Sequence, residues 1–269
     1  MTTRIERLPV PRFRSYIGID YSGAATPTSS LKGLRIYMTE EDGEPCEVLP
    51  PPSPRMYWTR RGTAEWLIEQ LRRDRPTLVG IDHAFSFPLA YFQSHCLPLS
   101  WEVFLEDFCR HWPTHGDRMT IDQLRKAPSG LAGQRQGDRR WRRLSERQSR
   151  SAKSVFHFDV QGQVAKSTHA GIPWLRRIRQ ELGGKVHFWP FDGWDIPASR
   201  SAIVEVYPRL WSGQFSHRDG WTTDQHDAYC VAAWLSRADR MGQLTPLLQP
   251  SLTEAERRIA QVEGWILGV

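Results

Sequence analysis

Short apolar runs that end at a polar or turn-forming residue recur along the chain and predict buried β-strands. The clearest are RSYIGID at residues 14–20 and TLVGID at residues 77–82, each of which closes on an aspartate. Continuous apolar runs of this length are typical of strands buried on both faces of a sheet. Further strands are predicted at residues 34–38, 56–59, 185–189 and 202–206.

Apolar residues spaced three and four apart predict the helices. In residues 63–73, Thr63 can cap a helix on which Trp66, Leu67 and Leu71 share one face. Helices are also predicted at residues 101–112, 172–182, 223–238 and 254–262. Strands that alternate with helices indicate an α/β fold with an antiparallel hairpin near its start. We expect a single domain over residues 1–269, in which residues 89–200 form a helical, basic elaboration of the core.

Composition narrows the classes of protein to consider. No stretch of the 269 residues approaches the roughly 18 consecutive apolar residues of a membrane helix. The first 14 residues lack the apolar segment of a secretory signal. The four cysteines form no CxxC pair, which favours a reduced compartment. We therefore expect a cytoplasmic protein with no membrane partner.

Positive charge is concentrated in one segment. The whole chain has a net charge of +6, whereas residues 118–153 alone carry eleven Lys and Arg against three acids. Arginine pairs with phosphate through two hydrogen bonds, and a tryptophan among arginines, such as Trp141, can stack on a base. A solvated helix face is the alternative explanation for such a run. We expect a mobile basic lid that binds nucleic acid, with four candidate substrate-binding residues: Arg139, Arg140, Arg142 and Arg143.

A repeated tripeptide supplies the first two candidate site residues. Gly18-Ile19-Asp20 and Gly80-Ile81-Asp82 each end a predicted strand and are followed by a turn. If the two strands are parallel neighbours, both carboxylates emerge at the edge where open α/β sheets bind ligands. The glycine two residues before each acid leaves space beside the backbone.

Two further acids suit the same edge. Glu205 lies inside the apolar run IVEV, and Asp227 lies at the start of the predicted helix at 223–238, followed by small residues that permit close packing. Four crowded carboxylates raise one another's pKa unless a cation joins them. Asp20, Asp82, Glu205 and Asp227 are therefore candidate catalytic residues and ligands of Mg²⁺ or Mn²⁺.

Each acid also has a structural alternative. Asp20 and Asp82 can cap turns, Asp227 can balance a helix N-terminus, and Glu205 can pair with a buried arginine. Asp224, one turn before Asp227, can cap the helix or join the site.

Several other polar residues are candidates for substrate binding. Ser22 follows the first aspartate in the turn after the first strand. Lys166 and His169 lie in the polar run KSTH, where His169 can move a proton or cap the helix that follows.

Longer segments of the chain resemble a known family. IGIDYSGA, GIDHAFSFP, VEVYPRLW and DQHDAYCVAAW resemble segments of the DUF429 family, and KSTHAGIPWLRRIR and EGWILGV extend the resemblance over nearly the whole chain. The family is regarded as predicted nucleases of ribonuclease-H-like fold. The resemblance implies a mixed five-stranded sheet flanked by helices, with its first three strands antiparallel and its first, fourth and fifth parallel. The family's acidic positions fall on Asp20, Asp82, Glu205 and Asp227.

Three functions follow as hypotheses. The first is a divalent-metal-dependent nuclease that hydrolyses phosphodiester bonds. The second is an actin-like ATP-binding phosphotransferase, because DYSGAAT at residues 20–26 is similar to the phosphate loop of those enzymes. A second glycine-rich loop of that class is missing after Asp82. The third is a nucleic-acid-binding protein without catalytic turnover.

Overall fold

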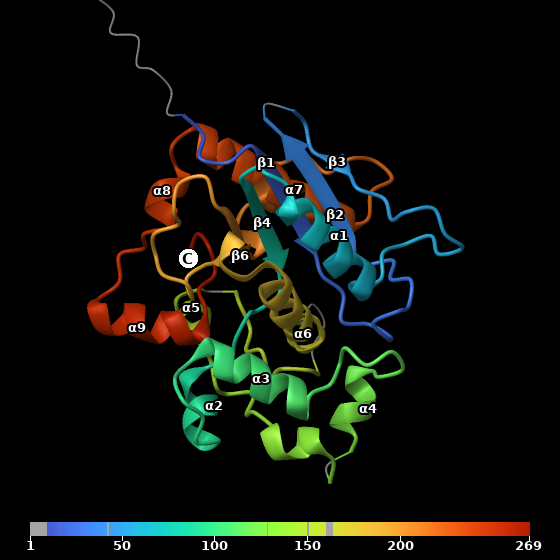
Figure 1. Ribbon diagram of the computed structural model, residues 1–269, viewed down its shortest axis with the longest axis vertical. Helices are drawn as coiled ribbons and strands as arrows, with labels where there is room; N and C mark the ends of the chain where they lie inside the picture. The colour runs from blue at the N-terminus through green and yellow to red at the C-terminus, as the bar shows by residue number, and fades with distance from the viewer. Residues whose placement is uncertain (1–9, 42, 128, 150, 160–163) are drawn as a thin grey trace, which may run out of the picture.

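A mixed sheet of six strands forms the centre of the described part of the chain (Figure 1). The computed structural model describes residues 10–41, 43–127, 129–149, 151–159 and 164–269. The strands lie in the order β3-β2-β1-β4-β6-β5. β1 pairs with β2 and β2 with β3 in antiparallel fashion, whereas β1, β4, β6 and β5 run parallel. Their bounds are β1 Ser15–Asp20, β2 Arg35–Glu40, β3 Cys46–Glu47, β4 Thr77–Asp82, β5 Val186–Phe188 and β6 Ser201–Glu205.

The described residues contain nine α-helices. They are α1 Arg60–Arg72, α2 Leu89–Ser94, α3 Trp101–His111, α4 Ile121–Arg125, α5 Leu144–Gln148, α6 Ala165–Leu182, α7 Thr223–Arg240, α8 Leu244–Leu247 and α9 Glu254–Glu263. Short 3₁₀ helices occur at Leu131–Arg135, Gly183–Lys185, Pro208–Leu210 and Ser212–Gln214. Among these described residues, no helix is both long and apolar enough to cross a membrane.

Helix α7 packs directly on the middle of the sheet because two strands present glycine to it. A Cβ on Gly18 of β1 would overlap the carbonyl oxygen of Ala228 and lie 2.7 Å from the amide nitrogen of Ala232. A Cβ on Gly80 of β4 would lie 2.7 Å from a methyl carbon of Val231. The small residues of α7 and the glycines of the two strands thus allow the close approach that the sequence predicts.

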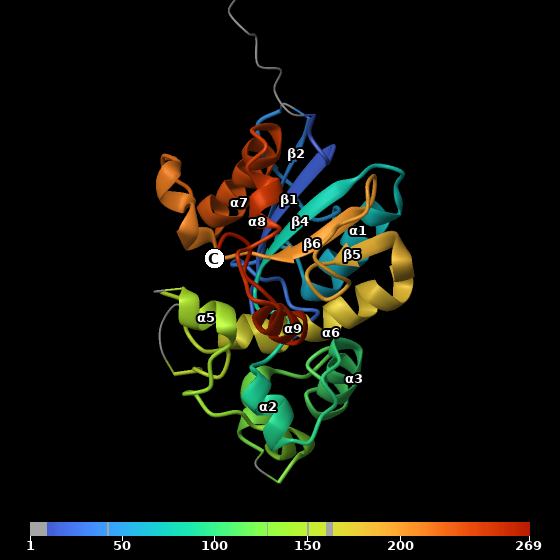
Figure 2. The ribbon, with the colours of Figure 1, turned by 90° about the vertical axis from the view of Figure 1, so that its left-hand side faces the viewer.

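The opposite face of the sheet is covered by α1 and α6, as Figure 2 shows. The alternate residues of β1 and β4 that point away from α7 are buried against these two helices. That core includes Ile17, Ile19, Val79, Ile81, Leu67, Leu71, Ile172 and Ile178. Burial on both faces accounts for the continuous apolar runs of β1 and β4.

The segment of residues 89–159, here called the lower lobe, lies at the carboxyl ends of the parallel strands (Figures 1 and 2). It contains α2, α3, α4 and α5, and α9 packs against α2, α3 and α5. The predicted elaboration at residues 89–200 also contains α6 and β5. These two elements belong to the layers of the core, so the lobe is shorter than predicted.

The structure corrects two predictions of local structure. Residues 56–59 form no strand, and Thr59 instead caps α1 by accepting a hydrogen bond from the amide of Gly62. Thr63 is therefore inside α1 and is not its cap. The third strand is the two-residue β3, which is too short to show a period of two in the sequence. The sheet has six strands in the described residues, not five, because β5 pairs along the outer edge of β6.

Candidate functional site

Two aspartates end neighbouring parallel strands. Asp20 is the last residue of β1 and Asp82 the last of β4, and the two are paired in register. Adjacent strands are about 4.8 Å apart, so the two carboxylates start from neighbouring positions. Both point to the face that carries α7, because Gly18 and Gly80 lie two residues earlier on the same face. This is the edge at which the repeated GID tripeptide predicts them.

The first turn of α7 brings two more aspartates to this edge. Thr222 caps the helix in a capping box with Gln225, so Asp224 is not the cap. Asp224 and Asp227 are three residues apart and share one side of the helix. Asp227 directly precedes Ala228, whose carbonyl oxygen lies against β1 at Gly18. The close packing of α7 therefore places Asp227 near the end of β1.

The pKa values of these aspartates reflect burial and mutual repulsion. Burial first, and then the charges of Asp82, Asp224 and Asp227, raise the pKa of Asp20 well above its usual range. Burial, Asp227 and Glu205 raise the pKa of Asp82 to about 8. Burial and Asp224 also raise the pKa of Asp227, while His226 and His217 oppose the shift. We refer to Asp20, Asp82, Asp224 and Asp227 as the acidic edge.

Glu205 lies differently from the other predicted acids. It is paired in register with Ile81, not with Asp82, so its side chain leaves β6 on the face opposite to α7. There Arg143 donates two hydrogen bonds to it, at 2.7 Å and 2.6 Å. The side chains of Arg143 and Glu205 are only 1% and 4% exposed. The structure thus matches the alternative that the sequence left open for Glu205, a pair with a buried arginine.

Arg143 and Arg142 are structural members of the lower lobe. Arg143 also donates from Nε to Glu146 at 2.8 Å and from a terminal nitrogen to the carbonyl of Glu263 at 3.2 Å. Arg142 donates to the carbonyl oxygens of Glu146 and Ala152. Arg143 is therefore engaged inside the protein, and the prediction that it binds substrate on a mobile lid is wrong. Arg142 is exposed, and these two backbone carbonyl groups hold its guanidinium.

The other predicted basic residues differ in exposure. Arg139 and Arg140 are exposed, and Arg140 pairs with Asp138 at 2.6 Å. Lys166 lies in the first turn of α6 and pairs with Asp122 at 2.8 Å.

His169 lies one turn further along α6, is 1% exposed, and donates from Nδ1 to the carbonyl of Ala165 at 2.8 Å. Burial lowers the pKa of His169 to about 3. A ring held neutral in this way does not suit the proton-transfer role that the sequence allows.

Ser22 lies in a loop that Arg60 holds from inside. Arg60 is buried and donates to the carbonyl oxygens of Ser22, Ala24 and Ala25 at 3.2 Å, 2.5 Å and 3.1 Å. The same loop touches α6, because a Cβ on Gly23 would lie 2.6 Å from the amide nitrogen of Ser167. The loop after β1 is thereby fixed between α1 and α6.

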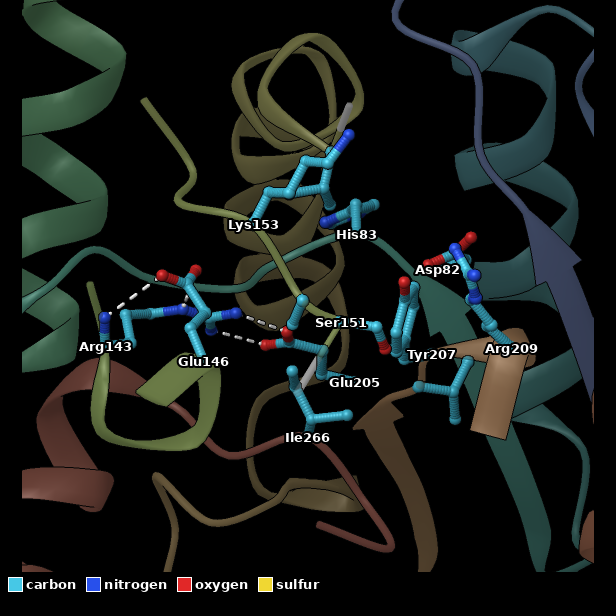
Figure 3. Close-up of a pocket in the computed structure, with 13 residues that line it drawn as sticks. Asp82, His83, Arg143, Glu146, Ser151, Lys153, Glu205, Tyr207, Arg209 and Ile266 are labelled. Atoms are coloured by element: carbon cyan, nitrogen blue, oxygen red, sulfur yellow. Dashed lines mark hydrogen bonds and ion pairs between the residues drawn. The ribbon is translucent and has the colours of Figure 1, made fainter. Parts of the chain in front are cut away.

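A cavity of about 130 Å³ adjoins the acidic edge at Asp82 (Figure 3). It lies where the chain leaves β4 and β6. Its lining includes the basic residues Lys153 and Arg209, together with Ser151 and Tyr207. In Figure 3, Asp82 and Arg209 appear toward one side of the cavity, and Glu205 with Arg143 toward the other. Sequence reasoning missed Arg209, although its position after a strand that ends at the same edge is a signal for it.

The acidic edge offers only carboxylate groups to a metal ion. Among the described residues, no three Asp, Glu, His or Cys side chains converge closely enough to hold one. The donor set nevertheless fits a hard cation, because the four side chains are carboxylates, and burial together with their crowding raises the pKa of three of them. Coordination would require these side chains to turn toward a common point.

Comparisons with known proteins add no assignment. Neither the family models, nor the curated proteins, nor the solved structures gave a match to this chain. The resemblance to the DUF429 family stays a prediction.

Proposed function

We propose that this protein is a divalent-metal-dependent nuclease that hydrolyses phosphodiester bonds at the acidic edge. The observation that carries the proposal is the position of four aspartates at one edge of the sheet. Asp20 and Asp82 lie opposite each other at the ends of two parallel strands. Asp224 and Asp227 lie on the helix packed against these strands. In this proposal Asp224 replaces Glu205 as the fourth acid of the predicted site. Glu205 holds the lower lobe to β6 through Arg143.

The strand directions support a ribonuclease-H-like fold as part of the proposal. β1, β2 and β3 are antiparallel, and β1, β4 and β6 are parallel, as the resemblance to the DUF429 family implies. β5 is then an addition to the outer edge. The acids fall on the first strand, the fourth strand and the last long helix, which are separate in sequence and adjacent in space.

The proposed cofactor is Mg²⁺ or Mn²⁺, held by Asp20, Asp82, Asp224 and Asp227. When bound at such carboxylates, a cation of this kind activates water for attack on a phosphodiester and stabilises the leaving oxygen. Arg209 and Lys153, which line the same cavity as Asp82, would bind phosphate oxygens of the substrate. The expected substrate is RNA, DNA or a hybrid of the two.

The ATP-binding alternative has less support. A phosphate loop presents successive backbone N–H groups to the ligand. In the loop after β1, three carbonyl oxygens are turned to Arg60, and the amide of Ala24 donates to Ser22 Oγ at 3.4 Å. The loop after β4 begins with His83, a buried side chain whose pKa is lowered by burial to about 4. A neutral, buried ring at this position offers no positive charge to a phosphate group.

The experiment is a cleavage assay with a panel of labelled single-stranded, duplex, hybrid and branched oligonucleotides in Mn²⁺ or Mg²⁺. We expect the wild type to cleave at least one member, and Asp20→Asn and Asp224→Asn to lower the rate at least a hundredfold. Asp74→Asn is the matched control, because Asp74 is an exposed carboxylate just before β4, at the opposite end of the sheet. Cleavage that survives Asp20→Asn, or a wild type inactive on the whole panel, would overturn the proposal.

A titration with Mn²⁺ alone separates the roles of Asp224 and Glu205. Asp224→Asn should weaken binding of the ion, whereas Glu205→Gln should lower stability and leave ion affinity at the folded protein nearly unchanged. Nucleic-acid binding without cleavage, and without any Mn²⁺ binding, would favour the non-catalytic alternative.

A further inference from the structure

The lower lobe contains a second and larger cavity, of about 660 Å³. That volume lies within the range of about 300–1,000 Å³ that small-molecule and cofactor sites occupy. Five aromatic rings line it: Trp112, Trp141, Phe156, Phe158 and His169. Three of the predicted substrate-binding or stacking residues line it: Arg139 and Trp141 from one loop, and His169 from α6.

The rings are held in place by their neighbours. The indole of Trp112 donates to the carbonyl of Arg135 at 3.2 Å, and His169 donates to Ala165 as described above. Phe156 packs edge-on against Phe87, with ring centroids 4.6 Å apart. Because these side chains are already ordered, a flat ligand that contacts them would lose little free energy to side-chain ordering.

Arginine accompanies the rings on the cavity wall. The guanidinium of Arg125 lies 4.3 Å from the ring centroid of Phe158, and Arg139 is exposed at the same cavity. The carboxylate of Asp138, which also lines the wall, is paired with Arg140. Aromatic faces for stacking and guanidinium groups for phosphate are the combination that single-stranded nucleic-acid sites use.

The cavity is connected to the acidic edge through the start of α6. His169 is three residues after Lys166, which is about 4.5 Å along the helix axis. The loop after Asp20 packs at Gly23 against the backbone of Lys166 and Ser167. The loop after Asp82 is fixed to the same turn, because the amide of Ala84 donates to Thr168 Oγ1 at 3.1 Å.

We propose that this cavity binds one unpaired nucleobase, with its phosphate, from a single strand of nucleic acid. The choice of ligand rests on the proposed function, while the binding itself requires neither metal nor cleavage. The base stacks on Trp141 and the neighbouring rings, and Arg139 and Arg125 bind the adjoining phosphate. A duplex would have to open to enter, so the cavity selects single-stranded or unpaired regions.

The experiment measures binding without cleavage. The full chain carrying Asp20→Asn is titrated, in buffer without divalent cations, into a fluorescein-labelled single-stranded oligonucleotide of mixed sequence and into its duplex, with anisotropy as the readout. We expect the single strand to bind more tightly than the duplex. Adding Trp141→Ala should weaken single-strand binding about tenfold, the range expected for loss of one stacked base, and Trp141→Phe should restore part of the loss.

Arg139→Gln gives an independent test, because Arg139 is exposed and its replacement does not threaten the fold. It should weaken binding and reduce the dependence of log Kd on log salt by about 0.7. Arg55→Gln is the matched control, since Arg55 is an exposed arginine in the loop before α1, and it should change neither quantity. The proposal is overturned if Trp141→Ala or Arg139→Gln leaves the affinity of the Asp20→Asn protein for the single strand nearly unchanged while circular dichroism shows an intact fold. A preference for duplex also overturns it.

The outcomes for the two proposals are separate. If single strands bind as described but no substrate is cleaved by the wild type, the nuclease is refuted and the base site stands. If Asp20 is required for cleavage but Trp141→Ala and Arg139→Gln leave both binding and cleavage unchanged, the base site is refuted and the nuclease stands.

Discussion

Removing Arg143 should be among the most destabilising single changes in the protein. The side chain is 1% exposed and makes ion pairs with Glu205 at 2.6 Å and with Glu146 at 2.8 Å. Arg143→Ala would leave two buried carboxylates without their partner. Breaking a buried ion pair from one side costs about 3–5 kcal/mol, so we expect the free energy of unfolding to fall by that amount.

The assay is urea denaturation followed by tryptophan fluorescence at pH 7. Arg140→Ala is the control, because Arg140 forms its ion pair with Asp138 at an exposed site, and its midpoint should stay close to that of the wild type. A triple variant, Arg143→Met with Glu146→Gln and Glu205→Gln, removes the charges together and should recover much of the loss.

Two results would refute this reasoning. If Arg143→Ala lowers the free energy of unfolding by less than about 1 kcal/mol, the buried ion pairs of Arg143 contribute no more to stability than a surface ion pair. A triple variant as unstable as Arg143→Ala would mean that lost packing, and not uncompensated charge, is the cause.

Three further predictions concern the acidic edge. Because the pKa of Asp82 is raised from 3.8 to about 8, the folded state keeps a proton between these values that the unfolded state releases, and stability without divalent cations should fall as pH rises through this range. Asp82→Asn should therefore raise the free energy of unfolding by at least about 1–3 kcal/mol at pH 8 and change it little at pH 4. Equal effects of the substitution in urea melts at the two pH values would contradict this. Gly18→Ala places a methyl group against the backbone of α7 at Ala228. It should lower the free energy of unfolding by at least about 1–3 kcal/mol in denaturation experiments and abolish cleavage. A fully active, stable variant would show that the helix packs differently. Arg209→Gln should raise KM several-fold for any oligonucleotide that the wild type cleaves, and an unchanged KM would remove Arg209 from the substrate site.

The sequence was sufficient for the two strand-end aspartates. Asp20 and Asp82 follow identical GI dipeptides on buried strands, so their equivalence could be recognised without knowledge of the register. The position of Asp227 could be predicted as well, because the small residues after it permit α7 to approach the glycines of β1 and β4.

Glu205 could not be placed in the same way. Side chains alternate along a strand, so a shift of one residue in the pairing of β6 with β4 moves Glu205 from one face to the other. That register depends on contacts among distant segments, including the bridge from Glu205 to Ile266 near the end of the chain. The pairing of Glu205 with Arg143, 62 positions earlier, is of the same long-range kind. β3 was not predicted for another reason. A strand of two residues is too short to show the alternation of buried and exposed side chains that marks a strand in the sequence.

Helix α6 gives the two proposed sites a fixed separation. Its first turns contact the loops after β1 and β4, which follow Asp20 and Asp82. The same turns supply His169 to the aromatic cavity, so one helix contacts both proposed sites. A strand whose base occupies the cavity would therefore be cut a constant number of nucleotides away, whatever its sequence. The products would have a defined length measured from an unpaired base, so the position of an unpaired region, and not a base sequence, would decide where cleavage falls.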